Sequence, residues 1–213
     1  MNVAVKPVPA GGSLLAEPPE IARVGVIGAG QMGNGIAHVC ALAGLPVTLL
    51  DVKPEALDRA MGTISRNMER QVNRSLVSAE DKDDALARIH TSVDYAELGD
   101  ADLVIEAATE KEDVKHAVFK LLTPHLKPSC MLASNTSSIS ITRLGAATDR
   151  PEKFIGMHFM NPVPVMKRSR SSVALPRMRR RSRRRSRWPR SCTRPRRWPR
   201  ISRRSSSTEF WCR

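Results

Sequence analysis

Residues 24–33 read Val-Gly-Val-Ile-Gly-Ala-Gly-Gln-Met-Gly, a short apolar run that passes directly into a glycine-rich turn. An apolar run of this length that ends in glycine is typical of a buried parallel strand. Within the stretch, Gly28, Gly30 and Gly33 have the spacing G-x-G-x-x-G. The first glycine of this pattern allows a tight turn, the second lets backbone approach a pyrophosphate, and the third lets a helix pack close to the strand. The stretch therefore predicts a strand, a turn and a helix whose N-terminus can bind phosphates.

Asp51 strengthens this interpretation. By itself the glycine pattern is weak, because a structural turn without a ligand is a common alternative in α/β domains. Here a second apolar run, residues 46–50, ends at Asp51, where a carboxylate can accept hydrogen bonds from ribose hydroxyls. Its charge would repel a 2′-phosphate, and the next residue is Val52 rather than an arginine. The sequence therefore predicts an NAD site rather than an NADP site.

Strand-like and helix-like segments alternate along the chain as far as Lys167. Such alternation is typical of a parallel sheet with helices on both faces. We therefore predict an α/β fold with a doubly wound Rossmann-type sheet in residues 21–167. The predicted strands cover residues 24–28, 46–51, 101–107, 130–134 and 154–159, and the predicted helices cover residues 36–43, 54–70, 78–88 and 113–126.

The charge of the chain changes sharply after Lys167. The whole sequence has a net charge of +14, but residues 1–167 hold 17 lysines and arginines against 20 acidic residues. Residues 168–213 hold 18 arginines and one glutamate, so the basic character belongs to this final segment. Residues 1–20, which contain four prolines, are predicted to form a flexible leader, and residues 168–213 a disordered, Arg-rich tail that cannot fold by burial.

Three interpretations of the tail compete. It is a frameshifted C-terminus, an Arg/Ser arm that binds nucleic acid or anionic lipid, or a solvated extension. Trp188, Trp198 and Trp211 are interspersed among the arginines and could stack on bases. The tail has no pattern for reading a groove, however, and no specific nucleic-acid partner is predicted.

Bulk features exclude several other classes of protein. No apolar run approaches the roughly 18 residues that a membrane span needs, and the leader lacks the regions of a signal peptide. The four cysteines have no metal-ligand spacing and indicate no disulfide framework. We therefore expect a cytoplasmic protein without a membrane span or a metal site.

Polar residues follow two further predicted strands. Ser137 lies just after one of them, and His158 and Asn161 lie at the end of another. Ligands of open α/β sheets bind beyond the carboxyl ends of the strands. His158 is a candidate general base, with a histidine packed within a strand as an equal alternative, and Ser137 is a candidate for binding a substrate hydroxyl or carbonyl group.

Three segments carry a family resemblance. They are Glu106-Ala107-Ala108-Thr109-Glu110 with Lys115 beyond it, Ser134-Asn135-Thr136-Ser137-Ser138, and His158-Phe159-Met160-Asn161-Pro162-Val163-Pro164-Val165-Met166-Lys167. They resemble the NAD-dependent 3-hydroxyacyl-CoA dehydrogenases, particularly the bacterial 3-hydroxybutyryl-CoA type, and the resemblance extends over residues 24–167.

The resemblance implies an oxidoreductase of fatty acid metabolism. It implies hydride transfer between NAD and C3 of (3S)-3-hydroxybutyryl-CoA or acetoacetyl-CoA. His158 is expected to remove the hydroxyl proton, Ser137 to bind the reacting oxygen, and Asn161 to orient substrate and nicotinamide. In this family a second, all-helical domain closes over the acyl-CoA and forms a homodimer.

The resemblance also assigns residues to the cofactor. Glu110 and Lys115 are expected to contact NAD. The adenosine half of NAD is expected to lie on Gly28, Gly30, Gly33 and Asp51.

The family places a glutamate that orients the histidine three residues after the position of Lys167, and here that residue is Arg170. In a frame that begins one nucleotide earlier, residues 170–178 permit Glu-Val-Ile-Arg-Gly-Leu-Ala-Thr-Asp, and residues 201–212 permit Asp-Leu-Pro-Ala-Phe-Val-Val-Asn-Arg-Ile-Leu-Val. Both hidden segments are family-like, and loss of one base after Lys167 is sufficient to hide them. The sequence therefore predicts a frameshift, absence of the helical domain and impaired activity. The alternative is an NAD-binding fragment without turnover, whose tail binds polyanions non-specifically.

Overall fold

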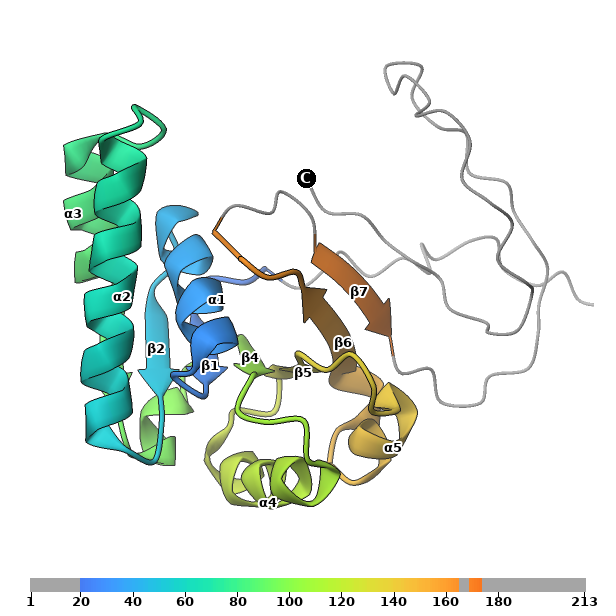
Figure 1. The fold of residues 1–213 in the computed structure, drawn as a ribbon. Coiled ribbons are helices and arrows are strands. Elements are labelled where there is room, and N and C mark those ends of the chain that lie inside the picture. The colour runs from blue at the N-terminus through green and yellow to red at the C-terminus, as the bar shows by residue number, and fades with distance from the viewer. Residues whose placement is uncertain (1–19, 165–168, 174–213) are drawn as a thin grey trace, which may run out of the picture.

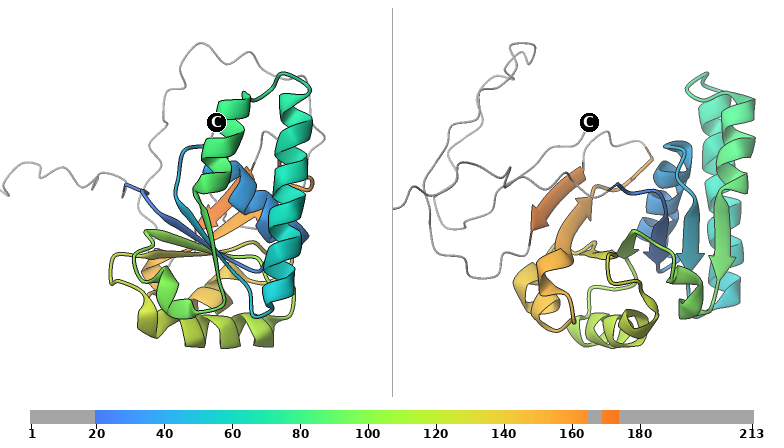
Figure 2. Two further views of the ribbon diagram at one scale, coloured as in Figure 1. Left: turned by 90° about the vertical axis from the view of Figure 1, so that its left-hand side faces the viewer. Right: turned by 180° about the vertical axis from the view of Figure 1, so that it is seen from behind.

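A seven-stranded sheet with helices on both faces organises the chain (Figures 1 and 2). The computed structural model describes residues 20–164 and 169–173. The strand order is β3-β2-β1-β4-β5-β6-β7, in which the first six strands are parallel and β7 is antiparallel to β6. The strands are β1 Val24–Ile27, β2 Val47–Leu50, β3 Ile89–Ser92, β4 Leu103–Glu106, β5 Met131–Ser134, β6 Phe154–Phe159 and β7 Ser169–Val173. This order confirms the predicted doubly wound Rossmann-type sheet.

The helices form two groups, one on each face of the sheet (Figure 1). One group packs on β1 and β2, and its second and third helices form a hairpin that extends beyond the sheet. The other group packs on β4, β5 and β6. The first group is α1 Gln31–Leu42, α2 Pro54–Val72 and α3 Ala79–Ala87, and the second is α4 Glu112–Leu122 and α5 Ile141–Ala146; short 3-10 turns lie at Tyr95–Leu98, Thr123–His125 and Pro151–Lys153.

Side chains of β4 alternate between two apolar cores. Leu103 and Ile105 belong to the core beneath α1 and α2, whereas Val104 belongs to the core beneath α4 and α5. In the second core the rings of Phe119 and Phe154 meet edge to face, with centroids 5.1 Å apart. Full burial of an aliphatic or phenylalanine side chain contributes about 1.5–3 kcal/mol. The continuous apolar runs of the sequence therefore reflect burial on both faces of the sheet.

Several element boundaries differ from the sequence-based expectation. Helix α1 begins at Gln31 instead of residue 36, because Gly30 is its N-cap and both Gly33 and Gly35 lie within the helix. Strand β3 and helix α5 were not predicted. β3 reads Ile-His-Thr-Ser, and only Ile89 of its four residues is buried, so an apolar pattern is missing.

The expected boundary at Lys167 needs one correction. Residues 168–213 were predicted to be disordered, but Ser169–Val173 form β7 and pair along the edge of β6. An edge strand presents unpaired N–H and C=O groups, and a neighbouring segment can bond to them whatever its side chains. The predicted flexible leader up to residue 19 and the predicted disorder of residues 174–213 lie outside the described residues.

Candidate active site

The glycine-rich turn between β1 and α1 uses backbone geometry that a side chain would disrupt. Gly28 has a φ of 99°, and a Cβ atom built there would lie 2.6 Å from the Cα atom of Ala108. A Cβ atom on Gly33 would lie 1.6 Å from the carbonyl oxygen of Gly28, so any side chain would force α1 away from β1. At Gly30 the corresponding position is open. Helix α1 therefore begins beside free space, with unbonded N–H groups in its first turn, as a phosphate site requires.

Asp51 joins the end of β2 to this turn. Its Oδ2 atom accepts a hydrogen bond from the backbone N–H of Ala29 at 2.8 Å, and its Oδ1 atom accepts one from the N–H of Lys53 at 3.1 Å. The carboxylate is partly exposed and has further lone pairs with which it can bind ribose hydroxyls. The turn glycines and Asp51 therefore meet at one place, and they fit a dinucleotide.

A buried ionic cluster lies at the carboxyl ends of β4 and β5. The Oε2 atom of Glu106 is 2.5 Å from Nζ of Lys115 and accepts a hydrogen bond from Oγ of Ser134 at 2.7 Å. The other carboxylate oxygen accepts from the N–H of Ala108 at 2.8 Å. The side chains of Glu106 and Lys115 are fully buried. This cluster fixes the loop that follows β4.

Glu110 holds the turn that contains Ser137. One carboxylate oxygen of Glu110 accepts from Oγ1 of Thr136 at 2.7 Å, and the other accepts from the N–H of Ser137 at 2.9 Å and its Oγ at 3.2 Å. Burial by itself would raise the pKa of Glu110, but these hydrogen bonds and the charge of Lys115 outweigh it and lower the pKa. Glu110 is therefore an ionised acceptor near neutral pH.

His158 lies near the carboxyl end of β6 and is partly buried. Asn135, the residue directly after β5, accepts a hydrogen bond through Oδ1 from the N–H of Phe159 at 3.0 Å. The backbone N–H of Asn135 in turn donates to the carbonyl oxygen of Glu106 at 2.7 Å. The ends of β4, β5 and β6 are therefore tied together beside His158.

Asn161 lies two residues beyond β6 and contacts the glycine-rich turn of residues 28–33, which is called the cofactor turn below. Its Oδ1 atom accepts a hydrogen bond from Nε2 of Gln31, the first residue of α1, at 3.4 Å. A segment 130 residues along the chain is thereby brought to the N-terminus of α1. Asn161 therefore lies beside the start of α1, and its contact with substrate and nicotinamide stays a prediction.

The structure thus brings most predicted site residues to one edge of the sheet. Lys115 is the exception. Its ammonium group forms an ion pair with Glu106 and its side chain has no exposed surface, so its direct contact with the cofactor stays a prediction. Sequence reasoning missed the roles of Glu106, Ser134 and Asn135. Ser134 ends a predicted strand and Glu106 is the last residue but one of another, and a polar residue near the carboxyl end of a buried strand is the signal that could have identified them.

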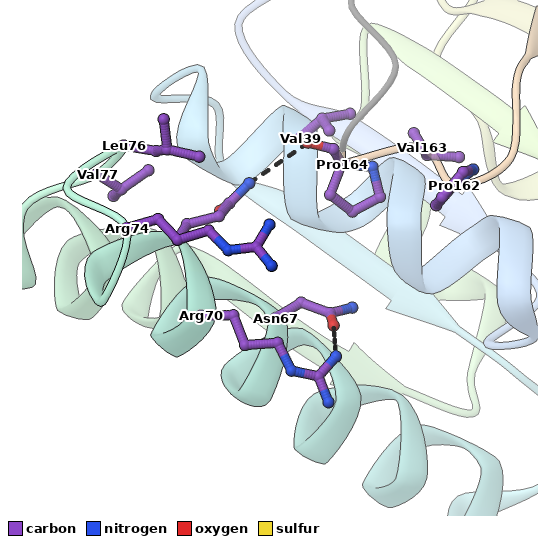
Figure 3. Close-up of a pocket in the computed structure, with 10 residues that line it drawn as sticks. Val39, Asn67, Arg70, Arg74, Leu76, Val77, Pro162, Val163 and Pro164 are labelled. Atoms are coloured by element: carbon purple, nitrogen blue, oxygen red, sulfur yellow. Dashed lines mark hydrogen bonds between the residues drawn. The ribbon is translucent and has the colours of Figure 1, made fainter.

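A separate cavity of about 700 Å³ lies between α1, α2 and the loop 162–164 (Figure 3). Arg70 and Arg74 of the α2 region line it together with apolar side chains such as Leu76 and Val163.

Gln71 links this cavity to the loop 162–164. Its Oε1 atom lies 3.0 Å from Nε2 of the buried His38, and its Nε2 donates to the carbonyl oxygen of Pro164 at 3.4 Å. Burial lowers the pKa of His38 despite the opposing effect of this hydrogen bond. His38 is therefore a neutral structural residue.

None of the helices within residues 20–164 and 169–173 combines the length and apolar character needed to span a membrane. These residues also contain no group of three or more His, Cys, Asp or Glu side chains that could hold a metal ion.

Comparisons with known proteins agree with this geometry. Residues 23–168 match the NAD-binding domain of 3-hydroxyacyl-CoA dehydrogenase. The chain is 60% identical over 146 residues to a 3-hydroxybutyryl-CoA dehydrogenase of Bradyrhizobium diazoefficiens, a match that covers 68% of this chain and 50% of that protein. It is 47% identical over 144 residues to a probable 3-hydroxybutyryl-CoA dehydrogenase of Deinococcus radiodurans, with coverages of 68% and 51%.

A solved structure gives the same result. The (S)-3-hydroxybutyryl-CoA dehydrogenase of Ralstonia eutropha is 45% identical and superimposes with a TM-score of 0.69, over 70% of this chain and 53% of that one. The chain spans about half the length of the curated relatives it matches.

Proposed function

The chain belongs to the NAD-dependent 3-hydroxyacyl-CoA dehydrogenase family, and from this membership we propose that it acts in hydride transfer between NAD and C3 of a short 3-hydroxyacyl-CoA. The observation that carries the proposal is the convergence of the cofactor turn with Ser137, His158 and Asn161 at one edge of the sheet. The link between Asn161 and Gln31 supports it, because it joins the two halves of that site.

We propose a role for each residue from the family resemblance, and its position supports that role. When NAD is bound, its nicotinamide supplies the hydride acceptor. His158 takes the proton of the C3 hydroxyl group and so acts as the general base. Ser137, held by Glu110, offers a hydroxyl group that binds the reacting oxygen. Asn161 orients the two reactants at the mouth of the turn.

The cavity beside α2 supports an acyl-CoA as the substrate. Coenzyme A carries several phosphate charges on a long and partly apolar chain. Arg70 and Arg74 supply the positive charge, and Leu76 and Val163 supply the apolar wall. The loop 162–164 that closes the cavity directly follows Asn161, so a ligand held there would extend toward the reacting groups. We propose 3-hydroxybutyryl-CoA and acetoacetyl-CoA as the substrate pair.

We further propose that turnover by this chain is impaired. The register of β6 and β7 pairs His158 directly with Arg170. The family resemblance independently assigns to this position the glutamate that orients the histidine. With arginine there, His158 lacks the carboxylate that would fix its ring and stabilise its cation.

A missing base after codon 167 is our explanation for Arg170 and for the arginines that follow. Sequencing the gene across codons 165–170 tests it. We expect the gene to lack one base of a Leu codon directly after the codon of Lys167. A gene in which no base is missing there would disprove the frameshift.

We place the protein in the cytoplasm, as a homodimer if a helical domain completes it.

Among the described residues, Cys40 and Cys130 are free thiols. Burial raises the pKa of Cys40 to about 11 and also raises that of Cys130, so both are poor nucleophiles.

The direct test is reduction of acetoacetyl-CoA by the purified chain, followed through NADH absorbance. We expect NADH to bind and turnover to be slow, and His158→Gln to abolish the remaining turnover without changing NADH affinity. Failure of the wild-type chain to bind NADH would refute the assignment of the site.

A further inference from the structure

The carboxyl end of β4 carries a charged pair whose complete burial needs a reason. Glu106 and Lys115 have no exposed side-chain surface, although both would be strongly hydrated in the unfolded chain. Removal of two charges from water commonly costs more than their mutual attraction returns. A buried pair is therefore weak evidence for stabilisation, and the contacts of Glu106 indicate what it does instead.

One oxygen of Glu106 acts on the backbone of the loop after β4. It accepts the N–H of Ala108 at 2.8 Å. Ala108 is also the residue against which the cofactor turn rests, because a Cβ atom on Gly28 would lie 2.6 Å from its Cα and 2.8 Å from its N. The neighbouring N–H of Ala107 bonds to the carbonyl oxygen of Ile27 at 2.8 Å. A displacement of Ala108 is therefore transmitted to the turn.

The other oxygen of Glu106 binds residues of two elements near Ser137, the proposed substrate-binding serine. It binds Ser134, the last residue of β5, and Lys115 of α4. Ser134 lies three residues before Ser137, which belongs to the loop that follows β5. The charge of Lys115 is also among the causes that keep Glu110, the acceptor of Ser137, ionised. The buried carboxylate of Glu106 thus binds both Ala108, which packs against the glycine-rich turn, and Ser134, which leads into the Ser137 loop.

We propose that Glu106 is a positioning residue for NAD binding, acting through Ala108 on the glycine turn and through Ser134 on the Ser137 loop. The inference rests on the assignment of NAD to this site. It differs from a direct role of Lys115 at the cofactor, because the effect of Glu106 would pass through Ala108 and Ser134.

Strand β4 offers a matched control at its opposite end. Asp102, directly before β4, pairs with Lys127 at 2.6 Å and accepts the N–H groups of Ala22 and Arg23 at 2.9 Å. This second pair also joins a carboxylate of the β4 segment to a lysine and to backbone. It lies at the amino end of the strand, away from the cofactor turn.

The test compares NADH affinity, from fluorescence titration, with the thermal midpoint. Glu106→Gln alone leaves Lys115 charged and unpaired, so we expect a lower midpoint. Glu106→Gln with Lys115→Met removes both charges, and we expect the midpoint to recover while NADH binds about tenfold more weakly. Asp102→Asn with Lys127→Met should bind NADH as the wild type does.

Ser134→Ala separates the inference from a direct role of Lys115, because it keeps both charges and removes one hydrogen bond. We expect it to fold and to bind NADH severalfold more weakly. Wild-type affinity in Ser134→Ala would overturn the inference, and a loss confined to the double variant would assign the effect to Lys115 itself. Wild-type affinity in the double variant would overturn it as well. Failure of the unaltered chain to bind NADH would instead refute the proposed function on which it rests.

Discussion

Glu110 and Ser137, 27 residues apart in the sequence, are joined by two hydrogen bonds. Glu110 accepts from the backbone N–H of Ser137 at 2.9 Å and from its hydroxyl group at 3.2 Å. The pair connects the loop after β4, where a cofactor residue was predicted, with the loop after β5, where a substrate residue was predicted. The two predicted roles are therefore physically coupled.

Replacement of Glu110 by glutamine is expected to loosen the Ser137 loop. Glutamine is neutral and has one acceptor oxygen in place of two. The N–H of Ser137 should therefore exchange with solvent faster than in the wild type, by about threefold to tenfold at pH 7. Hydrogen exchange followed by NMR measures this ratio. Thr123→Val, which removes a hydroxyl group at the C-terminal end of α4, should leave the exchange at Ser137 unchanged.

The same ratio should depend on pH. The folded pKa of Glu110 lies below its ordinary value of about 4.3, so its contribution is fully present above that value. It is lost as the pH falls through the lowered folded pKa, where wild-type Glu110 becomes neutral like glutamine. The two chains should therefore converge in acid, and a ratio that stays constant after Glu110 has taken up its proton, which NMR can follow, would contradict this account.

Arg170→Glu is expected to raise turnover of acetoacetyl-CoA with NADH by about 100-fold, a typical contribution of acid–base assistance. Position 170 lies directly opposite His158, and residues paired in this way have Cβ atoms roughly 5 Å apart in antiparallel sheets. Arg170→Gln serves as the control, because it removes the positive charge without adding a carboxylate. Equal rates for the two variants would show that the carboxylate is not what the site lacks.

Asp102→Asn is expected to lower the thermal midpoint by a few degrees at pH 7. A hydrogen bond from Lys127, followed by those from Ala22 and Arg23, lowers the pKa of Asp102 to about 2. Because the folded pKa is lowered, the stabilisation is present above the unfolded pKa of about 3.9 and is lost as the pH falls toward 2. Thermal unfolding of both chains between pH 7 and pH 2 should show the gap closing.

The Arg-rich segment is expected to bind polyanions without sequence preference. The full chain should bind mixed-sequence single-stranded DNA with an affinity that falls steeply with salt, whereas a chain that ends at Val173 should bind weakly. Fluorescence anisotropy across a salt series measures both. A clear preference for one sequence, retained at high salt, would revive the interpretation of this segment as a specific nucleic-acid arm.

The fold was predictable where local pattern and tertiary role coincide. Gly28 has a positive φ and Gly33 is crowded by the carbonyl oxygen of Gly28, so the spacing of these residues reports a geometry that other residues cannot adopt. β3 was missed because His90 is exposed and its pairing with β2 depends on backbone bonds rather than on an apolar pattern. Backbone pairing also decides the place of β7, which side-chain composition did not predict.

The sequence by itself determined the Rossmann-type sheet, the NAD turn and the family, because glycine spacing and apolar runs act through local geometry and burial. Only the tertiary structure decided which polar residues meet. In the tertiary structure Lys115 forms a buried ion pair with Glu106, and Glu110 accepts a hydrogen bond from the backbone N–H of Ser137. It also set Arg170 opposite His158. Such contacts join strand ends and loops that are distant in sequence, and their partners are fixed by strand order and register, which no local pattern encodes.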